Sequence, residues 1–288
     1  MAFYYANNSK LDYIYSNTYN YNVSCLLEER YFMNQEMKME VLKSLNIVEN
    51  VYYAIFQLEP LNMEIILVDK ISNQKNDETR GVMIPPKTID GKFSIKIKQN
   101  YCLDCLKQSD WQWAGTLTHE MTHVYDYSNY VKMNRLDNYD MVQYEFIHRP
   151  FVLWTEFNAR KIGYFFVRLF TFGKEFDDAA KQNQIDCILE TEFPYQLEKV
   201  SKVMKSSNET LDNKLYEAMQ FMGRYCVWEQ LFPEIFNEEK RKQTFDTKML
   251  TLYDFLVNHL TLEDANKDFD EMLNIIQMNF GGYRTKTF

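Results

Sequence analysis

One stretch of the chain, residues 109–127, combines two histidines and a glutamate with a largely apolar background. Within it, His119, Glu120 and His123 form the pattern HExxH. On an α-helix, residues four positions apart lie on one face one turn apart, so the two histidines can bind the same ion. Glu120 lies about 100° further round the helix, where it can reach a water on that ion without binding the ion itself. The motif therefore predicts a helix that carries part of a metal site.

The sequence around the motif favours a buried helix. Ser109 and Gln112 have the spacing of a capping box, Asp110 suits the positive end of a helix, and no proline follows as far as Tyr130. Most neighbours of the two histidines are apolar or small, which predicts burial and therefore a partner for the imidazole groups. A metal ion would be that partner. The alternative is a surface helix with two solvated histidines.

A catalytic zinc ion needs a third protein ligand. A second helix is predicted over residues 150–170, and Glu156, Ala159 and Gly163 share one of its faces. Small residues on that face would allow close approach to another helix, and Glu156 follows His123 by 33 residues, enough for the chain to turn and return. The sequence thus predicts the metal ligands His119, His123 and Glu156, with Glu120 as the catalytic base.

Other residues remain candidates for this site. Asp126 lies two turns from His119 on the same helix, a spacing that suits a hydrogen bond orienting a histidine better than direct metal binding. His148 precedes the second helix and is a candidate ligand or donor to a reacting oxygen; several tyrosines are alternative donors. His259 is a further candidate donor, but it lies on the apolar face of a later predicted helix, which favours a structural role. The segment between the two helices adds the acidic residues Asp137, Asp140 and Glu145.

A short sheet is predicted before the motif. Residues 63–68 are β-favouring, residues 81–85 are a second extended piece, and residues 92–99 follow a turn signal at Asp90-Gly91. In the last run, apolar residues alternate with lysines and a serine, as is typical of a strand with one buried face. Lysines also guard open sheet edges, so we predict that residues 92–99 form an edge strand to which an extended peptide could add.

The rest of the chain reads as mostly helical, which predicts an α+β fold. Residues 25–46 favour an amphipathic helix, and a C-terminal helical bundle is expected. The sequence predicts one globular unit of three parts: an arm and helix at 1–60, a metal-binding core at 61–172 and a helical region at 173–288. Within the last part, amphipathic helices are predicted at 174–205, 209–231 and 246–278.

Composition narrows the class of partner and compartment. The net charge of -9 argues against nucleic acid as a partner, because phosphate binding needs a concentrated positive face. No long apolar run and no secretory signal are evident, and five scattered cysteines fit a reducing compartment, so we expect a cytoplasmic protein with no membrane partner. The lone pair Cys102 and Cys105 favours two buried thiols over a metal site.

Taken together, these residues resemble the zincin metallopeptidases whose third ligand is a glutamate, the gluzincins. HEMTH at 119–123, the alternating strand before it and Glu156-x-x-Ala159 after it are similar to the ImmA/IrrE-like peptidases of phages and bacteria, over roughly residues 60–170. The resemblance implies a zincin-like fold with a small, mainly antiparallel sheet, and residues 92–99 as the substrate-binding edge. Thermolysin-like enzymes orient a histidine with an aspartate where this chain has Arg160. The resemblance also implies Zn²⁺ bound by His119, His123 and Glu156, and Glu120 as the general base.

Two functions follow. The first is a zinc-dependent metallopeptidase that hydrolyses a peptide bond of a protein or peptide substrate. The second is a catalytically silent zincin-like binding or regulatory module with a structural zinc. A fourth protein ligand such as His148 or Asp126 would favour the module, whereas an open fourth position would favour the enzyme. The substrate and the oligomeric state are left open by the sequence.

Overall fold

The computed structural model of the chain describes residues 30–71, 79–172 and 178–281. Helices dominate it and one small sheet accompanies them, so the predicted α+β class is confirmed. The elements in chain order are α2 (Arg30–Phe56), β1 (Met63–Val68), β2 (Gly81–Ile84), β3 (Phe93–Lys98), α3 (Gln99–Lys107), α4 (Gln112–Met133), α5 (Tyr139–Tyr144), the 3-10 helix η1 (Phe146–His148), α6 (Arg149–Phe172), α7 (Asp178–Cys187), the π-helix η2 (Ile188–Glu192), α8 (Phe193–Lys205), α9 (Leu211–Leu231), α10 (Glu238–Thr244), α11 (Thr247–Asn258), α12 (Leu262–Lys267) and α13 (Phe269–Phe280).

The sheet has the strand order β1-β3-β2 and is mixed rather than mainly antiparallel. β3 pairs in parallel with β1 and antiparallel with β2. The prediction that residues 92–99 form an edge is therefore wrong, because β3 is the central strand and β2 is an edge. The predicted alternation is present, with Phe93, Ile95 and Ile97 buried. Alternation reports which face of a strand is buried and carries no information about how many of its backbone edges are paired.

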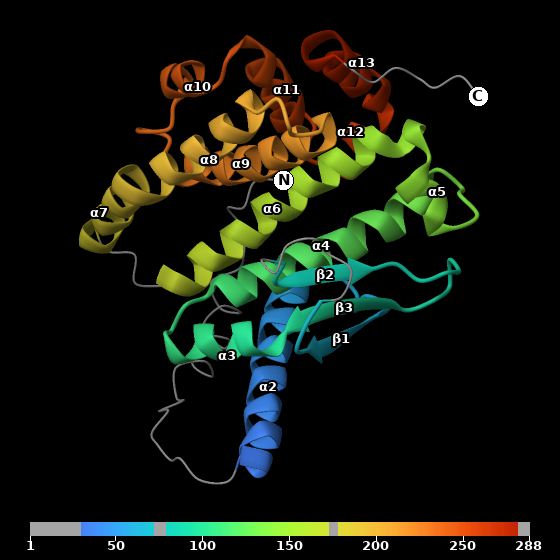
Figure 1. The fold of residues 1–288 in the computed structure, drawn as a ribbon, viewed down its shortest axis with the longest axis vertical. Helices are drawn as coiled ribbons and strands as arrows, with labels where there is room; N and C mark the ends of the chain where they lie inside the picture. The colour runs from blue at the N-terminus through green and yellow to red at the C-terminus, as the bar shows by residue number, and fades with distance from the viewer. Residues whose placement is uncertain (1–29, 72–78, 173–177, 282–288) are drawn as a thin grey trace.

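The helices lie in successive layers above the sheet (Figure 1). α4 packs on β2 and β3, α6 packs on α4, and α9 packs on α6. α12 and α13 also contact α6, whereas α8 and α11 contact α9. α2 crosses α4 and extends below the sheet. In this arrangement α4 and α6 are covered on both sides, which accounts for the burial of most of their residues.

Glycines set the spacing of the two central helix contacts. A Cβ atom on Gly163 of α6 would lie 2.5 Å from the carbonyl oxygen of Gly115 on α4, so both positions need glycine for this approach. At the other contact, a Cβ atom on Gly223 of α9 would lie 2.7 Å from the carbonyl oxygen of Phe157 on α6. The small face predicted for α6 is thus the face that contacts α4.

Several helix boundaries differ from the predictions. α2 continues through Phe56 as one helix, and the start predicted at residue 25 lies outside the described residues. Ser109 ends α3 in a left-handed conformation with φ 53°, so it does not cap α4; the Asp110 carboxylate instead accepts a hydrogen bond from the Gln112 N–H. Residues 246–278 form three helices, because Thr261 caps a new helix after α11.

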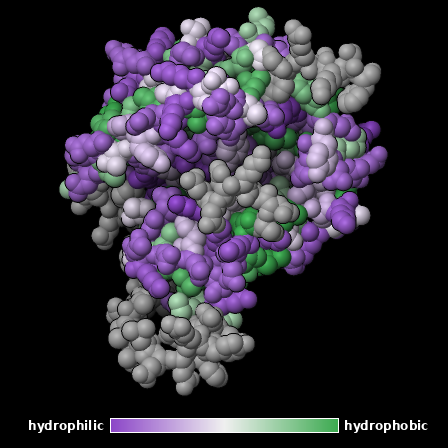
Figure 2. All heavy atoms as spheres, in the orientation of Figure 1, coloured by the Kyte–Doolittle hydropathy of each residue, from purple (hydrophilic) through white to green (hydrophobic). Residues whose placement is uncertain are grey.

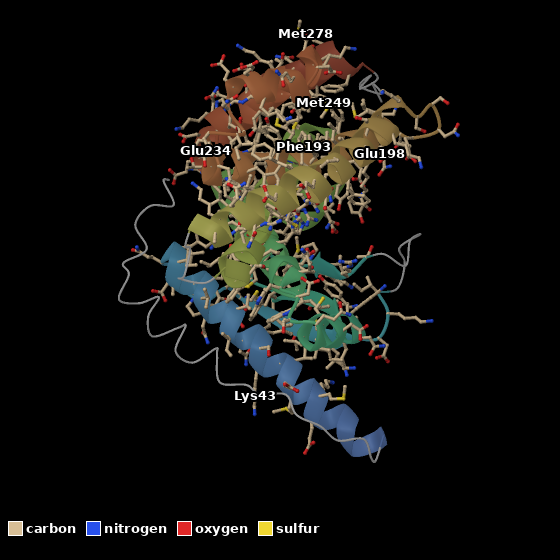
Figure 3. All side chains as sticks on the ribbon, turned by 90° about the vertical axis from the view of Figure 1, so that its left-hand side faces the viewer. Lys43, Phe193, Glu198, Glu234, Met249 and Met278 are labelled. Atoms are coloured by element: carbon tan, nitrogen blue, oxygen red, sulfur yellow. The ribbon has the colours of Figure 1, made fainter. Side chains whose placement is uncertain are left out.

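The C-terminal half has an aromatic core. Phe193 points inward from α8, where its ring lies 5.7 Å from that of Trp228 on α9, whereas Lys43 points away from α2 (Figure 3).

The predicted burial of Cys102 and Cys105 is confirmed. Among the described residues, none of the helices combines the length and apolarity needed to cross a membrane.

Candidate metal centre

The α4–α6 contact brings together the three predicted ligands. The Nε2 atoms of His119 and His123 lie 3.1 Å apart. Glu156 reaches across from α6, with one carboxylate oxygen 3.7 Å from the His119 Nε2 atom and the other 3.5 Å from the His123 Nε2 atom. Two helices, held close by Gly115 and Gly163, thus direct two nitrogens and a carboxylate at one point.

His123 is oriented by a chain of hydrogen bonds that runs back to its own helix. Its Nδ1 atom lies 3.1 Å from the hydroxyl oxygen of Thr155, and this hydroxyl donates to the Asp126 carboxylate at 2.7 Å. Asn158 donates to the same carboxylate at 3.0 Å. Since the Thr155 hydroxyl donates its proton to Asp126, the Thr155 oxygen accepts the Nδ1 proton of His123. The Nε2 atom then carries the lone pair, which is the tautomer that binds a metal.

Glu156 is oriented by a different helix. Gln220 of α9 donates from its amide to the Glu156 carboxylate at 2.8 Å. The amide oxygen of Gln220 accepts in turn from the Nε atom of Arg160, one turn after Glu156 on α6. Arg160 therefore supports Glu156 through Gln220.

Glu120 points away from the three converging ligands and towards the sheet. Its carboxylate accepts a hydrogen bond of 2.8 Å from the backbone N–H of Met83 on β2. Gly81 allows this approach, since a Cβ atom there would lie 2.6 Å from the Thr116 side chain and 3.4 Å from that of Glu120. The glutamate of the motif is thus placed between the metal-binding face of α4 and an edge strand.

Burial sets the charge state of the site. Burial and, to a lesser extent, the positive charge of Arg160 lower the pKa of His123 to about 3, and the pKa of His119 is also lowered, mainly by burial. Both imidazoles are therefore neutral at pH 7, as metal binding requires. Burial raises the pKa of Glu156 to about 7, and burial together with the charge of Glu156 raises that of Glu120 to about 8.

The donor set fits a metal ion. One ligand atom from each of His119, His123 and Glu156 lies within 4.8 Å of the others, and these three form the one such group found among the described residues. Two neutral imidazole nitrogens and a carboxylate oxygen facing one another need a cation between them, and two histidines with one glutamate is a ligand set of catalytic zinc.

The alternative ligands lie elsewhere. Asp126 takes the orienting position just described, acting on His123 through Thr155 rather than directly. His148 accepts from or donates to the Tyr130 hydroxyl at 2.8 Å, and His259 bonds the Phe255 carbonyl and Asp268. The metal-binding group in the described part of the chain contains none of these, nor the loop acids Asp137, Asp140 and Glu145.

Sequence reasoning missed Thr155, Asn158 and Gln220. Thr155 and Asn158 could have been predicted from their spacing. They lie one position before and two positions after Glu156, on the part of α6 that must face α4 if Glu156 does. Gln220 could not be predicted in this way, because its position depends on how α9 packs against α6.

No protein-family model matches this chain, and neither the curated proteins nor the solved structures contain a significant match to it.

Proposed function

We propose that the protein is a zinc-dependent metallopeptidase with a zincin-like active site. The observation that carries this proposal is that the two histidines and the glutamate of the α4 motif make different contacts. His119 and His123 converge with Glu156, while Glu120, the intervening glutamate, stays outside the ligand group and contacts an edge strand. A purely structural site has no need for a separately held carboxylate beside three ligands.

Each residue then has a distinct role. Zinc, when bound, polarises a substrate carbonyl group and makes water a stronger acid. Glu120, held outside the ligand group by the Met83 N–H, is positioned to accept a proton from that water and to deliver it to the leaving amine. Asp126 and Gln220 keep His123 and Glu156 in their binding orientations.

β2, rather than β3, is the strand that suits an extended substrate. The Met83 N–H points away from β3 to Glu120, whereas the carbonyl of Arg80, just before β2, accepts from the Lys98 N–H of β3. The outer edge of β2 thus runs past the proposed catalytic base. Hydrophobic side chains gather over β2 and β3 on this face (Figure 2), and Ile84 is 37% exposed. A peptide strand added beside β2 would pass close to Glu120.

Tyr216 of α9 is the hydroxyl donor that we propose for a developing oxyanion. Its side chain is 39% exposed, and its pKa is raised by burial and by the charges of Glu156 and Glu120, which shows that it lies within the electrostatic reach of both glutamates. His148 and His259, the other candidates, are bonded to groups outside the ligand cluster. A neutral hydroxyl beside the two glutamates supplies the hydrogen bond that a tetrahedral intermediate needs.

The silent-module alternative receives less support. It requires a fourth protein ligand, and the metal-binding group within the described ranges has three. The side chain of Glu156 is 19% exposed, so solvent reaches the ligand group at this residue. Three ligands with an accessible fourth position favour catalysis.

Replacement of the proposed base tests the function. Glu120→Gln should retain one zinc per chain and lose peptide cleavage by roughly 10²- to 10⁴-fold, the usual contribution of a general acid–base group. The assay is cleavage of a degenerate peptide library followed by mass spectrometry, with metal analysis of each preparation. Glu40→Gln, which removes an exposed carboxylate on α2, is the control. Cleavage that persists in Glu120→Gln, or a wild-type zinc protein that cuts no peptide, would overturn the assignment.

A further inference from the structure

Two arginines flank the glutamate side of the metal centre. Arg160 follows Glu156 by one turn on α6, and Arg224 follows Gln220 by one turn on α9. Gln220 joins them, since its amide oxygen accepts from Arg160 Nε and its backbone carbonyl accepts from Arg224 Nη1 at 3.0 Å. The same Gln220 side chain bonds Glu156, so both guanidinium groups are tied to the ligand cluster.

Neither arginine has a carboxylate partner among the residues that the structure describes. No ion pair within 4.0 Å joins Arg160 or Arg224 to an acidic side chain there, and their remaining N–H groups make no hydrogen bond within the same residues. Both side chains are only partly exposed.

The acidic residues around Arg224 are already committed to other cations. Glu192 is paired with Arg168, and Glu217 is paired with Lys199 at 2.9 Å. Burial and the like charge of Arg160 lower the pKa of Arg224 to about 9. Two partly buried guanidinium groups of like charge are stabilised by an anion that joins them.

Charge balance points the same way. Arg160 acts electrostatically on His119, His123, Glu120 and Glu156, so it lies within the field of the whole site. When a divalent ion is bound, the ion and the two arginines together outweigh the two glutamates. The site is then positive, and the guanidinium N–H groups of Arg160 and Arg224 match a carboxylate in geometry as well as charge.

From these contacts we propose that Arg160 and Arg224 form a carboxylate-binding subsite, so that the substrate is a peptide with a carboxylate close to the bond that is cut. This inference rests on the proposed peptidase function and specifies its substrate class. The carboxylate can belong to an acidic side chain or to the C-terminus of the substrate, and the experiment separates these two sources.

The test measures peptide binding, so that it does not depend on turnover. The probes are pools of synthetic peptides of one length that carry Asp or Glu at randomised positions, with matched pools that carry Asn or Gln. Each pool is made with a free and with an amidated C-terminus. Binding to the zinc-loaded Glu120→Gln protein is measured by fluorescence polarisation.

The expected result is at least about tenfold tighter binding of a carboxylate-bearing pool than of its matched amide pool, as a charge-assisted hydrogen bond provides. A preference that depends on Asp or Glu assigns the subsite to a side chain, and one that depends on the free C-terminus assigns it to the terminal carboxylate. Arg224→Gln should reduce the ratio of the two affinities to near one, and Arg224→Lys should leave an intermediate ratio. Lys132→Gln, which removes one exposed positive charge on α4, should keep the wild-type ratio.

Equal binding of acidic and amide pools to the unsubstituted arginine pair would overturn the subsite, and this comparison needs no arginine variant to fold. A preference that survives in a folded Arg224→Gln protein would overturn it as well. The peptidase proposal fails separately: a wild-type zinc protein that binds carboxylate peptides selectively but cuts none of them keeps the subsite and loses the catalytic role.

Discussion

Helix α6 packs closely against α4 on one side and against α9 on the other, but the two contacts bring different side chains to the site. Towards α4, Gly163 meets Gly115, and this contact joins the three ligand side chains. Towards α9, Gly223 meets the backbone at Phe157, and this contact brings in Gln220, Arg224 and Tyr216. The first contact builds the metal site, and the second orients a ligand and surrounds the site with donors. One helix thus connects the chemistry to the groups that we propose select the substrate.

The largest effect on zinc binding is expected from removal of the ligand Glu156. Glu156→Ala should weaken zinc binding by more than the roughly hundredfold that loss of a supporting hydrogen bond can cost, because one of three ligands is gone. Zinc affinity measured by competition with a chromogenic chelator checks this, with Glu145→Ala as an exposed control. Undiminished zinc binding in Glu156→Ala would show that the third ligand lies elsewhere.

Alanine substitutions at the two contact glycines of α6 distinguish the role of the α4 contact from that of the α9 contact. Gly163→Ala and Gly223→Ala each place a Cβ atom within 3 Å of backbone, so each should destabilise the fold by about 1–3 kcal/mol. Only Gly163→Ala should also lower zinc affinity strongly, because it moves Glu156 away from α4. Urea unfolding and zinc titration of both variants give the comparison. Equal loss of zinc affinity in the two would mean that the α4–α6 contact has no special role in the site.

The supporting hydrogen bonds should matter on both sides of α6. Asp126→Asn disturbs the acceptor of Thr155 and Asn158, and Gln220→Met removes the amide that bonds Glu156. Each should weaken zinc binding by about 10- to 100-fold. Asp140→Asn, at an exposed position on α5, serves as the control. If neither supporting variant differed from this control, the networks would be incidental to metal binding.

The smallest effect concerns the pH dependence of the zinc-free protein. Three buried carboxyls have raised pKa values, about 8 for Glu120 and about 7 for Asp126 and Glu156, so the folded state binds more protons than the unfolded state between about pH 4 and 8. Stability should therefore rise as pH falls from 8 to 6.5. Below about 6.5 the histidines oppose this, because their lowered pKa values make the folded state bind fewer protons there.

Thermal melting of the chelator-treated protein between pH 5 and 8 measures this balance. We expect the melting temperature to rise by a few degrees from pH 8 to 6.5 and then to level off. Asp126→Asn should flatten the rise. A melting temperature that increases steadily from pH 6.5 to 8 would contradict the raised pKa values.

The site residues that could be predicted from the sequence are those whose positions depend on residue spacing within one helix. His119, Glu120 and His123 are placed by helical geometry alone, and Glu156 is marked by the small residues that follow it on α6. The edge strand was assigned wrongly because the number of partners of β3 depends on β2, which is only four residues long. Gln220 and Arg224 could not be found, since nothing local distinguishes them from other polar residues on a long helix.

The most direct test of the α4–α6 site is zinc X-ray absorption spectroscopy on the purified full chain, combined with metal analysis. We predict one zinc per chain with two imidazole nitrogens, one carboxylate and a light atom from solvent in its coordination sphere, and no sulfur. A chain that binds no zinc, or a spectrum that requires sulfur or a third imidazole, would contradict the site formed by His119, His123 and Glu156.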